Sequence, residues 1–156
     1  MVDELYKAAI FGDFDAVKKI VAMSPEVVNN KDKYGFTVLH GLAEEENLEI
    51  MQYLIDYGAN VNVKNDEGIT PLHLAGWADI VKLLIKNGAN LESVSKNGET
   101  PLVNLASEQE REDVIEALLQ AGANVNAKNA RGETALDIAI SRGENEKICV
   151  IQKYAE

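Results

Sequence analysis

The sequence predicts an all-helical solenoid, a stack of short helix-turn-helix units, and three observations support this prediction. A phrase of the form Gly-x-Thr-Pro-Leu-His is complete at Gly68–His73 and has weaker copies that begin at Gly35, Gly98 and Gly132. A second phrase, Gly-Ala-Asn, starts twelve residues before a threonine of the first phrase, at Gly58, Gly88 and Gly122. Between the phrases, apolar pairs recur at helical spacing, such as Ile50/Met51 with Leu54/Ile55. Self-similarity at a period in the low thirties is typical of units that stack only on their neighbours.

Each element of a unit has a local cause in the sequence. The threonines are suited to cap the helix that follows, and a proline directly after Thr70 and Thr100 fits the first turn, where its missing N–H costs nothing. Glycine after the second helix of a unit permits a left-handed exit. Asn, Asp and Gly are frequent between each Gly-Ala-Asn and the next threonine, which favours a tight projecting hairpin.

These phrases resemble the ankyrin repeat, whose signature is Thr-Pro-Leu-His followed by alanine, and the resemblance covers nearly the whole chain. It implies an all-α ankyrin-repeat solenoid with projecting β-hairpin loops. We predict a single domain over residues 1–156, with repeats at 1–34, 35–67, 68–97, 98–131 and 132–156. The first and last repeats are expected to be caps with a polar outer side. In the last one, Ile148 and Ile151 serve the core, and Lys147, Gln152 and Lys153 replace apolar residues of a middle repeat.

The third repeat is shorter than its neighbours. The threonines Thr37, Thr70, Thr100 and Thr134 lie 33, 30 and 34 residues apart, and the short interval is lost between Thr70 and Gly88. The first helix of this repeat should therefore be shorter by about 4.5 Å, nearly one turn, if the lost residues were helical. Such a notch either exposes the neighbouring inner helices or is filled by Trp77; a tolerated deletion in the inter-helix turn explains the spacing equally well.

Composition narrows the function classes. A net charge of −11 argues against binding nucleic acid or an anionic membrane and mildly favours a partner with a basic surface. The single cysteine, Cys149, cannot form an internal disulfide, and we expect it to be a buried structural thiol. The N-terminal residues lack the pattern of a signal peptide, and no apolar run approaches the ~20 residues that span a bilayer. We therefore expect a cytoplasmic protein.

Catalysis and metal binding find little support in the sequence. His40 and His73 occupy equivalent positions in successive repeats, and one interpretation is a metal pair. Stacked helices lie ~8–10 Å apart, however, which places equivalent side chains poorly for sharing one ion. The ankyrin resemblance implies instead that each histidine hydrogen-bonds the threonine and the neighbouring hairpin. No nucleophile elbow, phosphate loop or dinucleotide fingerprint is present. We predict no enzyme activity, no metal and no cofactor.

The surface remains as the functional element. The resemblance implies protein binding through hairpin tips and inner helices, and exposed aromatic and aliphatic anchors dominate interface energetics. Mapped by position, the predicted partner-binding residues are Tyr34, Phe36, Glu44, Glu45, Asp66, Glu67, Ile69 and Trp77. Packing between adjacent hairpins is an equally good explanation for Phe36 and Ile69. We predict a non-catalytic protein–protein interaction module, monomeric, whose concave face binds a partner. The alternatives are a regulatory or inhibitory subunit of an enzyme, self-association, and small-ligand binding at the third-repeat notch.

Overall fold

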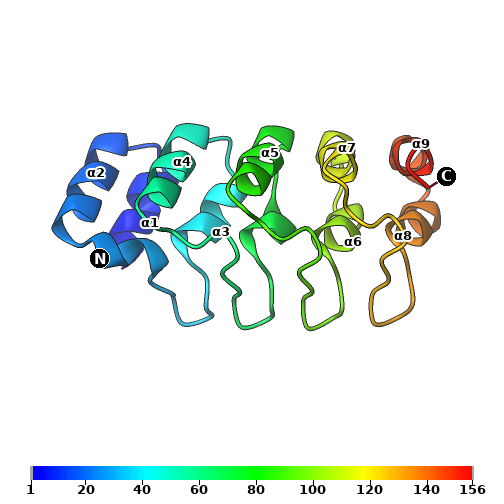
Figure 1. Cartoon of the computed structure of the whole chain (residues 1–156), viewed down its shortest axis with the longest axis horizontal. Helices are drawn as coiled ribbons and strands as arrows, with labels where there is room; N and C mark the ends of the chain where they lie inside the picture. The colour runs from blue at the N-terminus through cyan, green and yellow to red at the C-terminus, as the bar shows by residue number, and fades with distance from the viewer. Residues whose placement is uncertain (1, 156) are drawn as a thin grey trace.

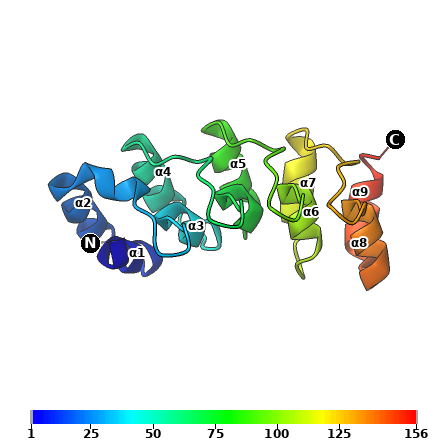
Figure 2. The same cartoon turned by 90° about the horizontal axis from the view of Figure 1, so that it is seen from below.

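The fold is a single row of helix pairs, seen in a computed structural model that describes residues 2–155. Figure 1 shows the two termini at opposite ends of the row and the hairpins projecting together from one side. Figure 2, seen from below, shows the same succession of units along the long axis. Each unit packs on the units beside it, so that the stack presents extended surfaces along its length.

Two layers of helices form the row. The inner layer consists of α1 (Val2–Ile10), α3 (Val38–Ala43), the 3₁₀ turn η2 (Pro71–Leu74), α6 (Pro101–Ala106) and α8 (Ala135–Arg142). The outer layer consists of α2 (Phe14–Met23), α4 (Leu48–Asp56), α5 (Ala78–Lys86), α7 (Glu112–Gln120) and α9 (Asn145–Gln152), and a second 3₁₀ turn, η1 (Pro25–Asn29), follows α2. The predicted all-helical ankyrin-type solenoid is thereby confirmed.

The hairpins are tight turns, without any regular strand between residues 2 and 155. Each is closed by one backbone hydrogen bond across its base, from Asp32 N to Phe36 O (2.8 Å) in the first and from Asn65 N to Ile69 O (2.9 Å) in the second. Successive hairpins are joined by further backbone bonds, beginning with Asp66 N to Tyr34 O at 3.0 Å. The tips therefore form a continuous ledge rather than independent loops.

The helix caps predicted at the threonines are present. The threonines Thr37, Thr70, Thr100 and Thr134 each precede an inner helix with extended backbone. Pro71 and Pro101 occupy the first helical position, as expected from their fixed φ and missing donor. Gly58 leaves its outer helix with a φ of 91°, a conformation that favours glycine over any side chain.

The core lies between the two layers and runs without a break along the row. On α4, Ile50, Met51 and Leu54 are buried and Ile55 is half-buried, and α5 and α7 repeat the pattern. Fully burying one such side chain contributes about 1.5–3 kcal/mol. Stability thus depends on helix pairs that cannot bury their apolar faces alone.

The predicted shortening of the third repeat is confirmed. Its inner element is one four-residue 3₁₀ turn, whereas α3 and α6 are six-residue α-helices. Trp77 does not fill the notch: it is the N-cap residue of α5 and 42% exposed. The chain itself closes the gap, because Gly76 N donates to Ala43 O at 2.8 Å.

Two expectations for the last repeat were wrong. Lys147 is completely buried rather than part of a polar outer face, because its aliphatic stem occupies the core position that Ile80 and Val114 hold in earlier repeats. Its Nζ remains satisfied by donating to the Glu108 carbonyl oxygen and pairing with Glu144 (2.6 Å). Cys149 is exposed rather than buried, since it lies on the side of α9 away from buried Ile151.

Within residues 2–155, no helix combines the length and the apolar character needed to cross a bilayer.

Candidate functional site

Three predicted residues line one depression that spans the first two repeats and reaches Leu74 of the third. Tyr34, Phe36 and Glu44 share a space of about 270 Å³ with residues that we did not predict, among them Tyr6, Asp32 and Leu74. We call this depression the N-terminal hollow. A second depression of about 310 Å³ adjoins it, sharing Tyr6, Asp32 and Phe36 and adding Asp3. Aromatic rings and carboxylates thus lie together in one region of the inner-helix face.

The first hairpin and helix α1 position these side chains. Asp32 Oδ1 accepts hydrogen bonds from the backbone N–H groups of Tyr34 (2.8 Å) and Phe36 (2.9 Å), which fixes the turn that presents both rings. Phe36 packs edge-on against His40, with 5.3 Å between ring centroids, and is half-buried. Tyr34 is 57% exposed at the tip. The hollow therefore combines one half-buried ring, packed against His40, with one exposed ring.

The remaining predicted residues lie outside the hollow. Asp66 is adjacent, because its N–H bonds Tyr34 O, whereas Glu67 pairs with Lys96 on the next hairpin (3.6 Å). Ile69 is half-buried, as hairpin packing would require. Glu45 is exposed after α3, and Trp77 is exposed before α5. The structure thus brings together Tyr34, Phe36 and Glu44 and leaves the others as separate surface positions.

The notch forms its own small cavity, of about 230 Å³, lined by His73, Asn104, Arg111 and both Glu44 and Glu108. Side chains of the fourth repeat satisfy carbonyl groups that a full helical turn would have bonded. Asn104 Nδ2 donates to His73 O (2.8 Å), and an Arg111 guanidinium N–H donates to Gly76 O (2.8 Å). The volume lies below the about 300–1,000 Å³ of ordinary small-molecule sites, and two of its polar side chains, Asn104 and Arg111, already bond backbone carbonyl groups, although Arg111 Nε is buried without a hydrogen-bond partner among the described residues. The notch is thus a contact between repeats in which side chains of the fourth repeat replace the missing helical hydrogen bonds.

Both histidines are structural. His40 Nδ1 accepts the Thr37 N–H (3.0 Å) and its Nε2 meets Ile69 O (3.0 Å); His73 Nδ1 accepts the Thr70 N–H (3.2 Å) and its Nε2 meets Glu99 O (3.0 Å). Because Nδ1 accepts, Nε2 carries the proton and donates to the hairpin carbonyl. Burial lowers the pKa of His40 and His73 below the ordinary 6.5. Neutral histidine thus ties each threonine cap to the next hairpin, as the family resemblance implied.

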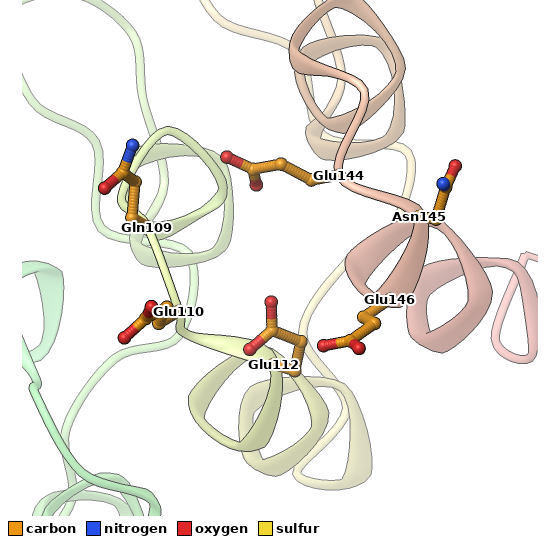
Figure 3. Close-up of a pocket in the computed structure, with 6 residues that line it drawn as sticks. All are labelled: Gln109, Glu110, Glu112, Glu144, Asn145 and Glu146. Carbon is orange, nitrogen blue, oxygen red and sulfur yellow. The ribbon is translucent and has the colours of Figure 1, made fainter.

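An acidic depression lies at the far end of the row, between α7 and α9. Its volume is about 490 Å³ and its lining residues are Gln109, Glu110, Glu112, Glu144, Asn145 and Glu146. In Figure 3 the side chains of Glu112, Glu144 and Glu146 point into the space between the two repeats. The hydrogen bond from Lys147 lowers the pKa of Glu144, which is already paired through that lysine and Arg142. No group of three His, Cys, Asp or Glu suited to a metal ion occurs within the described part of the chain.

Several curated proteins resemble parts of this chain. Alpha-latrocrustotoxin-Lt1a of Latrodectus tredecimguttatus is 42% identical over 72 residues, which is 46% of this chain and 5% of that protein. Protein phosphatase 1 regulatory subunit 27 of Mus musculus is 30% identical over 93 residues, 58% of this chain and 60% of that protein. Human transient receptor potential cation channel subfamily A member 1 is 33% identical over 106 residues, 64% of this chain and 9% of that protein. The matched stretches therefore cover less than two thirds of each relative.

A family model of ankyrin repeats in three copies matches residues 5–93 and 76–155, nearly the whole chain. The hydrogen-bonded Thr-Pro-Leu-His turn and the stacked helix pairs described above are the structural counterpart of that match. Ankyrin repeats mediate protein–protein interaction, and members of the family are typically non-catalytic. The chain belongs to the ankyrin-repeat family.

Proposed function

We propose that this chain is a non-catalytic, monomeric module that binds a partner protein through the inner-helix face and hairpin tips of its first three repeats. The observation that carries the proposal is the N-terminal hollow, where exposed Tyr34 stands beside Phe36, Tyr6 and Glu44. Tyrosine and other aromatic side chains are the residues that most often dominate interface energetics. Trp77, also exposed, extends the surface to the third repeat.

The charge of the chain defines the kind of partner. With a net charge of −11 and Glu44, Glu45, Asp66 and Glu67 exposed along this face, the surface suits a partner with basic residues. Exposed carboxylates chiefly accelerate association and make it salt-dependent, whereas the aromatic anchors hold the complex. High salt should therefore weaken capture of the partner.

A regulatory role toward an enzyme is a narrower form of the proposal. It is supported by the likeness to protein phosphatase 1 regulatory subunit 27, which spans 58% of this chain. If the captured partner is an enzyme, adding the purified chain should change its rate, and an unchanged rate would remove this narrower form alone.

The experiment compares three immobilised baits in native lysate: the wild type, a Tyr34→Ala/Trp77→Ala variant, and an Ile140→Ala control. Ile140 is a suitable control because it is 55% exposed on α8, far from the first three repeats. We expect the wild type and the control to retain a partner that the double variant loses. Equal recovery on all three baits, each shown to be folded, would refute the proposed surface. Light scattering of the free chain tests whether it is monomeric.

A further inference from the structure

Two residues of the N-terminal hollow depart from the repeat pattern: Asp32 at the hairpin base and Gly41 in the middle of α3. Both line the hollow together with Tyr6 of α1. Local folding requires neither departure, which leaves the hollow itself as the reason for them.

The negative charge of Asp32 is not required by the turn. Its Oδ1 accepts the N–H groups two and four residues further on, at Tyr34 and Phe36. The later hairpins make the same pair of bonds with uncharged side chains, Asn65, Ser95 and Asn129. Only an acceptor oxygen is needed there, so the charge of Asp32 is free to act on something outside the turn.

Gly41 is not required by the helix. The corresponding inner-helix positions hold Leu74, Asn104 and Ile138, and glycine inside a helix is less stable than alanine. Gly41 has no positive φ that would explain it. What explains it is space: a Cβ at this position would overlap the ring of Tyr6. The missing side chain lets the Tyr6 ring lie against α3, where it forms one wall of the hollow.

A depression lined by aromatic rings and carboxylates is suited to bind a cationic group. Aromatic faces attract cations, and the exposed Lys33 ammonium already lies 4.8 Å from the Tyr34 ring centroid. Asp32 and Glu44 line the hollow, Asp3 lines the adjoining depression, and no lysine or arginine is among the lining residues of either. A guanidinium is planar, weakly hydrated and able to bond a carboxylate while stacking on a ring, so it suits this set better than an ammonium.

We propose that the N-terminal hollow binds an arginine side chain of the partner protein. This assignment rests on the proposed function, because it names the contact by which that surface recognises its partner. The Tyr6, Tyr34 and Phe36 rings contact the guanidinium and its aliphatic stem, and Asp32 and Glu44 supply the counter-charge. The Lys33 ammonium already lies over the Tyr34 ring and competes with the bound cation. A cation that interacts weakly with the ring therefore does not displace it.

The test uses short blocked peptides with a single arginine between alanines, with citrulline and lysine versions as probes. Citrulline keeps the shape of arginine and lacks its charge. Amide chemical shifts of the isotope-labelled full chain report both affinity and location. The arginine peptide should shift the amides of Tyr34, Phe36 and Gly41, and the citrulline peptide should not. The acidic depression at Glu112, Glu144 and Glu146 is an internal control, since it offers carboxylates without aromatic lining residues.

Two variants distinguish an effect on arginine binding in the hollow from an effect on folding. Asp32→Asn keeps the turn acceptor, as Asn65 does, and should weaken arginine binding by roughly two- to fivefold, the range for an exposed ion pair. Gly41→Ala should displace the Tyr6 ring and abolish the arginine-dependent shifts while helix content is preserved. If Gly41→Ala disturbs the stack, Tyr6→Leu removes the same ring without touching α3.

The outcomes are distinct. Equal shifts with citrulline, stronger binding of lysine, or shifts centred on the acidic depression would overturn the arginine assignment. Insensitivity to both Asp32→Asn and Gly41→Ala would do the same. Loss of partner capture by the Tyr34→Ala/Trp77→Ala bait together with no arginine binding would leave the proposed function standing and reject this inference. Arginine binding with unchanged capture would reject the proposed surface instead.

Discussion

Replacing His73 with valine should destabilise the chain and remove part of its sensitivity to acid. His73 is fully buried and links the Thr70 N–H to the hairpin carbonyl of Glu99. Valine is a fair replacement in shape, because Val103 fills the equivalent buried position of the fourth repeat. The change therefore removes hydrogen bonds and a titratable ring and leaves a position that the fold demonstrably accepts.

The cost at neutral pH follows from which groups lose their partners. Glu99 O keeps the Ser95 N–H at 3.0 Å, so it is not left unsatisfied. The N–H and the hydroxyl of Thr70, a residue only 1% exposed, both lose His73 Nδ1 as a hydrogen-bond partner. One buried donor left unsatisfied costs about 1–3 kcal/mol. We expect His73→Val to lower the free energy of unfolding by at least that amount.

Acid should reduce this difference. Burial lowers the pKa of His73 in the folded chain, while the unfolded chain keeps the ordinary value near 6.5. Below that value the unfolded chain binds the proton and the folded chain does not, so the free energy of unfolding falls as pH falls. The slope is at most about 1.4 kcal/mol per pH unit for each histidine. His40, whose pKa burial also lowers, adds a second contribution in the wild type.

Chemical denaturation between about pH 7.5 and pH 5 measures both effects, since carboxylates such as Asp137 and Glu144, whose pKa values are lowered, contribute only at more acidic pH. The wild type should lose stability below about pH 6.5, His73→Val should lose less, and the gap between them should narrow. A His40→Val/His73→Val double variant should be nearly insensitive over this window. Parallel curves for the wild type and His73→Val would refute the reasoning.

Three further predictions concern the third-repeat notch and the last repeat. Gly76→Ala should lower the thermal midpoint clearly, because its Cβ would stand 3.0 Å from the Glu44 carbonyl oxygen, where backbone cannot yield cheaply. Arg111→Ala should cost about 1–3 kcal/mol in urea unfolding, by leaving the Gly76 carbonyl without its donor. Lys147→Met should cost less than Lys147→Ala, because methionine keeps the apolar stem at this core position, and Lys147→Ala should cost about 2–4 kcal/mol. Equal losses for both substitutions of Lys147 would show that its ammonium contacts outweigh its packing.

The repeat architecture was predictable because its causes are local. Threonine caps, prolines in first turns and the left-handed glycines act within a few residues, and each recurs often enough to be recognised in a single sequence. The histidine hydrogen bonds followed from the family resemblance in the same way. The short third helix was predictable from spacing alone.

What the sequence did not reveal depends on contacts between distant residues. The notch is closed by the bond from Gly76 N to Ala43 O and by Arg111, which lies 35 residues from Gly76 along the chain, and not by the nearby Trp77. Lys147 was assigned to the surface by its charge, although its stem replaces a core isoleucine and its head reaches Glu108, 39 residues away. Charge type alone does not show whether a long side chain has an internal partner.

The N-terminal hollow was half predictable. Tyr34, Phe36 and Glu44 were found as tip and inner-helix residues, but Tyr6 and Asp32 were not. A signal for them exists: Gly41 stands where other repeats hold a side chain, and Asp32 where they hold Asn or Ser. Comparing the repeats position by position would have singled out Asp32 and Gly41, whereas the contact of Gly41 with Tyr6 is seen only in the structure.

The most direct test of the central claim is site-specific photo-crosslinking from position 34, with position 140 as the reference. A photoreactive phenylalanine analogue replaces Tyr34 in one chain and Ile140 in the other, both at exposed positions on the inner-helix and hairpin side. We expect a covalent adduct with the partner from position 34 that high salt diminishes, and none from position 140. An adduct from position 140 alone would place the partner on the last repeat and contradict the proposed binding surface.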